Sequence, residues 1–154
     1  MAALSDYLES GLLNHVFRGA DFPKPSAIAI ALTSGVPQDS HTGATISEIP
    51  QTINGSGTGY ARIVLNDTSV SGNEYWSFSD DDFAAGSGLI KNAANRAFES
   101  ALLDWGWVSG IAILDSGVYG SGNLLMHAQL DNPRIIYMGD SVVFNEDTLQ
   151  ISFK

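Results

Sequence analysis

The chain has 154 residues, of which 44% are hydrophobic and only 16% are charged, and its net charge is −10. This length is sufficient to bury a core without disulfides or metals, so we expect one domain over residues 1–154. With seven Lys and Arg residues and no cysteine, the composition excludes a basic patch for nucleic acid or an anionic membrane, and a thiol for catalysis. No apolar run approaches the roughly 20 residues that cross a bilayer and no signal-peptide pattern is present, so we expect synthesis in the cytoplasm without membrane binding.

The first predicted element is an α-helix over residues 5–18. Its apolar residues follow the 3.6-residue period of one helix face, Asp6 lies in the first turn, Arg18 lies in the last turn, and Gly19 follows as a stop. We therefore predict an amphipathic helix, and Leu8 and Leu12 on its apolar face are candidate partner contacts.

A buried strand and a long loop follow this helix. Between residues 27 and 32, large apolar residues alternate with alanines, which predicts a strand covered on both sides. Residues 34–58 are rich in Ser, Thr and Gly, and contain Ile46, Ile49 and Ile53 as isolated apolar residues. One interpretation is an extended arm that becomes ordered on a neighbouring subunit, with the three isoleucines as candidate contacts. The other interpretation is a surface loop without a partner.

The remainder of the chain consists of short apolar segments separated by turn residues such as Asn, Asp, Gly and Pro. The alanines after Leu89 would also suit a helix, but we assign that segment as a strand. We predict a mainly β fold, a jelly-roll-like antiparallel β-sandwich with one N-terminal α-helix and a long Ser/Thr/Gly-rich loop. The predicted strands occupy residues 60–65, 74–78, 89–98, 107–114, 124–130, 135–138, 141–144 and 148–153.

Residues that carry chemistry are few. His15, His41 and His127 stand apart, without a second histidine or carboxylate at a metal-ligand spacing. No serine has the surroundings of a nucleophile elbow, and no glycine cluster matches a nucleotide-binding loop. The acidic run Asp80–Asp82 could share a hard cation such as Ca²⁺, although the EF-hand pattern is missing. We predict no catalytic residue, no cofactor and no metal, and hence a protein that is not an enzyme.

The tryptophans allow two interpretations. Trp76, Trp105 and Trp107 could form a platform on which a glycan stacks, because sugar C–H faces pack on indole rings. Core packing is the alternative, which the glycine between Trp105 and Trp107 and the apolar strand beside it favour.

The order and spacing of several elements resemble a family of short tailed-phage structural proteins, with labels such as tail-fibre-like protein or capsid cement protein. The resemblance covers most of the chain and transfers no catalytic residue. The elements that carry it are Leu4 to Glu9 with Leu12-Leu13, Leu32-Thr33-Ser34, Gly59-Tyr60-Ala61-Arg62, Asp104-Trp105-Gly106, Gly110 to Asp115, Gly122 to Leu125, Pro133, Gly139-Asp140, and Leu149 to Phe153.

The resemblance implies a non-enzymatic virion protein made in the cytoplasm of a bacterial host. Our first interpretation is a capsid cement (decoration) protein that binds the major capsid protein or other virion proteins as a homotrimer and lies on the capsid surface. A compact module with a loose arm and few charges suits that role. A tail-fibre or tail-associated protein for host recognition is the alternative, although no repeat or heptad of a fibre shaft appears. A carbohydrate-binding module is the third interpretation.

Overall fold

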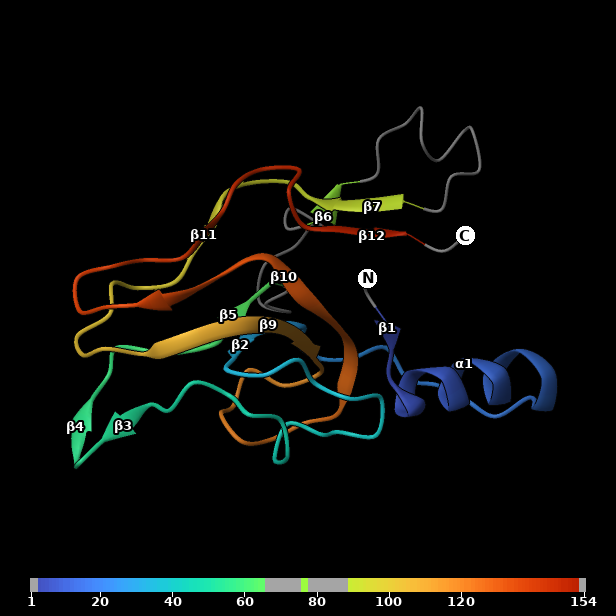
Figure 1. Cartoon of the computed structure of the whole chain (residues 1–154). Coiled ribbons are helices and arrows are strands. Elements are labelled where there is room, and N and C mark those ends of the chain that lie inside the picture. The colour runs from blue at the N-terminus through green and yellow to red at the C-terminus, as the bar shows by residue number, and fades with distance from the viewer. Residues whose placement is uncertain (1–2, 66–75, 78–88, 153–154) are drawn as a thin grey trace.

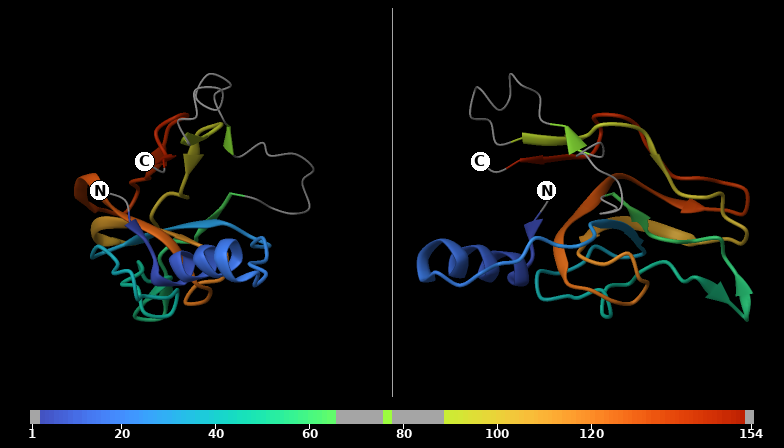
Figure 2. Two further views of the ribbon diagram at one scale, coloured as in Figure 1. Left: turned by 90° about the vertical axis from the view of Figure 1, so that its right-hand side faces the viewer. Right: turned by 180° about the vertical axis from the view of Figure 1, so that it is seen from behind.

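The computed structural model describes residues 3–65, 76–77 and 89–152, and the predicted fold class, mainly β with one N-terminal helix, is confirmed (Figure 1). A five-stranded antiparallel sheet forms one layer, and a smaller sheet lies across from it in both figures (Figures 1 and 2). The acidic run Asp80–Asp82 lies outside the described residues.

The five-stranded sheet has the order β1-β10-β9-β2-β5. Its strands are β1 (Ala3–Leu4), β10 (Leu124–Ile136), β9 (Gly106–Leu114), β2 (Ala29–Thr33) and β5 (Ile63–Val64). The opposite layer is β12 (Gln150–Ser152), β7 (Leu89–Asn92) and β6 (Trp76–Ser77), and two short pairs join β11 (Val143–Phe144) to β8 (Arg96–Ala97) and β3 (Thr52–Ile53) to β4 (Ser56–Gly57). The segment after Leu89 is thus extended rather than helical.

The central strand β2 is buried along its whole length, as its alternating sequence predicts. Ile30 pairs with Ile113 and Leu32 with Ile111, so these large side chains share one face of the sheet. Ala31 pairs with Ala112 on the other face, where small side chains leave room for a covering loop. Each fully buried Ile or Leu side chain stabilises the fold by roughly 1.5–3 kcal/mol.

Strand β10 differs from the prediction, which places a turn at residues 131–133 between two strands. The structure forms a single bent strand instead, in which Gln129 pairs with Gly110 and the next pair is Arg134 with Val108. Several residues of β10 therefore lie opposite Ser109 alone, which is a β-bulge. Pro133 is tolerated here because a bulge residue need not donate a ladder hydrogen bond.

Candidate functional site

Helix α1 (Asp6–Arg18) is confirmed where the sequence predicts it. Ser5 is its N-cap, and the Ser5 Oγ accepts a hydrogen bond from the Leu8 amide at 3.2 Å. Gly19 ends the helix with a φ of 66°, a left-handed conformation that glycine adopts without steric cost.

The apolar face of α1 is not covered by the other parts of the chain that the structure describes. Side chains are exposed to 59% at Leu13, 66% at Val16 and 78% at Phe17, and Leu12 is exposed as well. Leu8 is half-buried, and no residue of α1 is fully buried. In Figure 2, α1 projects from the side of the sheet. We call Leu12, Leu13, Val16 and Phe17 the exposed α1 face.

The opposite side of α1 is covered by the segment that follows it. The Phe22 ring lies 5.6 Å from the Tyr7 ring, measured between centroids. It also lies against Gly11, where an added Cβ would be 2.3 Å from a Phe22 ring carbon, so glycine is required there for this packing. The chain thus stabilises one side of α1 and leaves the exposed α1 face open.

The base of α1 is fixed to the large sheet. Strand β1 pairs with β10, the Ser5 amide donates to the Leu125 carbonyl at 3.0 Å, and the buried Ser5 hydroxyl donates to the Leu124 carbonyl. The Asp6 amide donates to the Asp39 carbonyl at 3.0 Å. These bonds hold the start of the helix in a defined position relative to the body.

The loop of residues 34–58 is not a free arm in this structure. Ile46 is 7% exposed and Ile49 is 1% exposed, so both belong to the core of the same chain, and Ile53 is half-buried in β3. The Ile49 amide donates to the Leu32 carbonyl at 3.1 Å, which ties the loop to the edge of β2. Two of the three isoleucines expected to anchor the loop on a partner, Ile46 and Ile49, therefore cover the chain's own sheet.

A buried ion pair between Glu48 and Arg62 explains why this polar loop is ordered. The Arg62 Nε and Nη2 atoms donate to the two Glu48 carboxylate oxygens at 2.8 and 2.7 Å, and both side chains are almost fully buried. The Arg62 Nη1 atom donates to the Ser116 and Ser121 carbonyls at 2.8 Å. One guanidinium thus joins the long loop, the start of β5 and the turn after β9.

Tyr60 completes this polar cluster. Its hydroxyl donates to Glu48 Oε1 at 2.9 Å and accepts from the Leu32 amide at 3.0 Å. Burial raises the pKa of Tyr60 far above its ordinary value, and the neighbouring Glu48 carboxylate raises this pKa further. The pairing of Tyr60 and Arg62 with Glu48 was not predicted from the sequence, although Tyr60 and Arg62 lie in the Gly59-Tyr60-Ala61-Arg62 element that carries the family resemblance.

The tryptophans do not form a joint platform that includes Trp105. Trp105 is 4% exposed, donates from Nε1 to the Thr58 carbonyl at 2.9 Å and packs edge-on against Tyr60, as the core interpretation predicts. Trp107 is 51% exposed, contrary to the core interpretation, and lies next to Ile135 on the paired strand. The side chain of Trp76 lies outside the description.

The histidines stand apart from one another. The His127 ring is mostly buried, and its Nε2 lies 2.8 Å from Asp39 Oδ1, a pairing that the sequence spacing did not indicate. The His41 Nδ1 accepts from the Gln38 amide at 3.3 Å. Among the described residues, no group of three or more His, Cys, Asp or Glu side chains is placed to hold a metal ion. No helix in the described ranges has the length and hydropathy to cross a bilayer.

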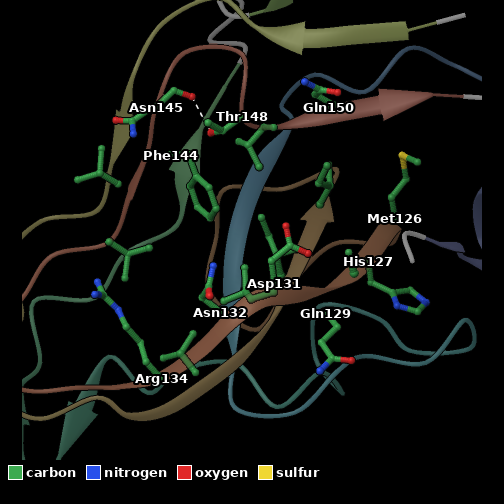
Figure 3. A pocket seen from close by; sticks show the side chains of 18 of the residues that line it. Met126, His127, Gln129, Asp131, Asn132, Arg134, Phe144, Asn145, Thr148 and Gln150 are labelled. Carbon is green, nitrogen blue, oxygen red and sulfur yellow. Dashed lines mark hydrogen bonds between the residues drawn. The ribbon is translucent and has the colours of Figure 1, made fainter.

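A cavity of about 620 Å³ lies between the large sheet and the chain's C-terminal strands (Figure 3). Its floor is apolar and comes from β9 and β10, with Ile111, Ile113 and Ala128 among the residues. Polar residues of β10 and of the segment from β11 to β12 surround this floor: Asp131, Asn132, Arg134, Asn145, Thr148 and Gln150. This site was not predicted from the sequence, because Asp131 and Asn132 have the composition of a turn.

Comparison with known proteins assigns the chain to a family. Residues 3–152 match the family described as podophage GP4 fiber I protein gp80, and the chain belongs to that family. It is therefore a phage structural protein and a component of the virion, as the resemblance implies. No curated protein matches the chain.

Proposed function

We propose that the chain is a non-enzymatic subunit of a podophage tail fibre, which joins the tail through α1 and exposes its β-sandwich to the surroundings. Membership of a fibre protein family over residues 3–152 is the observation that carries this proposal. The family description favours the tail over the capsid-cement role that the sequence analysis ranked first.

The exposed α1 face supports attachment through the helix. Binding to a partner that covers Leu13, Val16 and Phe17 would be stabilised by the burial of their apolar surface. Each fully buried side chain would contribute roughly 1.5–3 kcal/mol. Their spacing presents anchors on successive turns of one helix face. Because β1 and Ser5 fix the helix base, little conformational entropy is lost when a partner covers this face.

The size of α1 favours a groove as its binding site rather than another copy of the same helix. A helix of 13 residues is about 20 Å long. Stable interfaces bury roughly 800 Å² of surface on each partner. Two short helices that pack side by side bury less surface than this. A groove contacts a helix on several sides, so we propose that α1 inserts into an apolar groove of another tail protein.

In this proposal the β-sandwich forms the part of the fibre that points away from the tail. The predicted homotrimer is retained as a proposal and is tested by light scattering of the purified chain.

Immunogold electron microscopy of intact virions tests the proposed location. Label at the tail is the expected result. Label over the head would replace the fibre role by capsid cement, and virions without label under conditions that label the purified chain would contradict both roles.

A further inference from the structure

The cavity between β10 and the C-terminal strands has no part in the attachment proposed for α1. Its volume of about 620 Å³ falls within the roughly 300–1,000 Å³ of sites for small ligands. Figure 3 shows Asp131 and Asn132 in the middle of this region and Phe144 above them. The bulge in β10 places these two residues here, and bulges commonly redirect side chains next to functional sites.

The polar side chains on β10 are available to a ligand. Asp131 and Asn132 are exposed and make no side-chain hydrogen bond to any residue that the structure describes. An amide group offers donors and an acceptor in one plane, and a carboxylate adds acceptors. This set matches a ligand whose groups both donate and accept hydrogen bonds, which is the property of hydroxyls.

The walls of the cavity are held in place by the fold. Arg134 donates from Nη2 to the Ser141 carbonyl at 3.1 Å, and Thr148 Oγ1 donates to the Asn145 carbonyl at 2.7 Å. The floor residue Ile111 is buried within the large sheet. A site on a rigid sheet loses little entropy when a ligand binds.

The charges exclude strongly anionic ligands. Asp131 and Arg134 provide one charge of each sign at the cavity, whereas a polyphosphate or nucleic acid requires several basic residues. The apolar floor fits a ring with C–H faces, and the surrounding amides fit its hydroxyls. We propose that this cavity binds a short, uncharged or weakly charged oligosaccharide of the bacterial surface. This ligand class rests on the proposed fibre function.

Binding of the purified, fluorescently labelled chain to cells of the host strain tests the ligand class. Periodate cleaves vicinal diols of glycans, so pretreatment of the cells with periodate should abolish binding, while pretreatment with protease should leave it unchanged. Loss of binding after protease alone would assign a protein ligand and overturn the proposal. Absence of binding to untreated cells would overturn it too.

Variants of the cavity test the location. Asp131→Ala and Asn132→Ala should each weaken binding of oligosaccharides released from the host surface by about tenfold or more in calorimetry, because the first removes a carboxylate and the second a planar amide. Gln51→Ala removes a planar amide from an exposed position elsewhere and should bind like the wild type. Equal affinity of all three variants would overturn the proposal.

Nuclear magnetic resonance separates the failure of this inference from the failure of the fibre role. The backbone amides of residues 129–134 should shift when the oligosaccharides are added, and shifts confined to the region of Trp107 would place the site elsewhere. Tail labelling of virions does not depend on either result. A chain that labels the tail but binds no glycan in the cavity would retain the fibre role and lose this inference.

Discussion

Helix α1 and the loop of residues 34–58 were both candidates for partner contacts, but they differ in the burial of their apolar side chains. The isoleucines of the loop cover the chain's own sheet, with Ile49 only 1% exposed, whereas Phe17 on α1 is 78% exposed. The loop also has a buried polar partner, the Arg62 guanidinium, whereas no residue of α1 itself is buried. A loop rich in Ser, Thr and Gly can thus be part of the core, and a regular helix can be the surface that remains for another protein.

The largest effect on stability is expected from removal of the ion pair between Glu48 and Arg62, which holds the loop. Arg62→Ala leaves the Glu48 carboxylate buried without its partner, which should lower the free energy of unfolding by about 3–5 kcal/mol. Urea unfolding followed by circular dichroism measures the loss. A loss below about 1 kcal/mol would show that the loop does not depend on this pair.

The core role of the loop isoleucines is tested next. Ile49→Ala should lower the free energy of unfolding by about 2–5 kcal/mol, because it leaves a cavity under β2. Ile53→Ala in the half-buried β3 should cost distinctly less and serves as the control. An equally small loss, below about 1 kcal/mol, for both variants would mean that the loop is a loosely attached arm.

Removal of the N-cap of α1 should lower the free energy of unfolding by a smaller amount. Ser5→Ala removes a cap and a buried bond to β10, so we expect a loss of about 1–2 kcal/mol. Hydrogen exchange of the α1 amides should accelerate more than exchange in β2. Uniform acceleration would indicate that Ser5 stabilises the whole fold rather than the base of the helix.

A pH dependence follows from Tyr60. Burial raises the pKa of Tyr60 in the folded chain. In the unfolded chain the pKa of a tyrosine phenol is about 10. Stability from this proton is therefore complete below about pH 10 and falls as the pH rises above it, by up to about 1.4 kcal/mol per unit. Tyr60→Phe should show a shallower fall, and an unchanged slope would contradict this assignment.

The sequence was sufficient for elements that local patterns determine. The period, caps and glycine stop of α1 are all local, and the alternation in β2 directly reports a strand buried on both sides. The same period gave the prediction that the apolar face of α1 contacts a partner, which stays a prediction. Its exposure is a tertiary property, since it depends on Phe22 packing against the opposite side.

Elements that depend on contacts between distant residues could not be predicted. Arg62 bonds to Glu48, Ser116 and Ser121 across large separations in the sequence, and nothing local in the sequence marks these residues as partners. The segment Asp131-Asn132-Pro133 has turn residues, but pairing with β9 on both sides converts it into a bulge. The cavity was missed for the same reason, because its residues gather from β9, β10 and the C-terminal strands.

The measurement that tests the attachment through α1 most directly compares two matched valines. Val16 on α1 and Val118 in the turn after β9 are 66% and 67% exposed, so replacement by serine should change the free energy of unfolding by less than about 0.5 kcal/mol in either case. Phages that carry each variant are purified, and the amount of the chain per virion is measured by mass spectrometry. We expect Val16→Ser to reduce incorporation severalfold and Val118→Ser to leave it unchanged, and equal incorporation of the two would contradict attachment through α1.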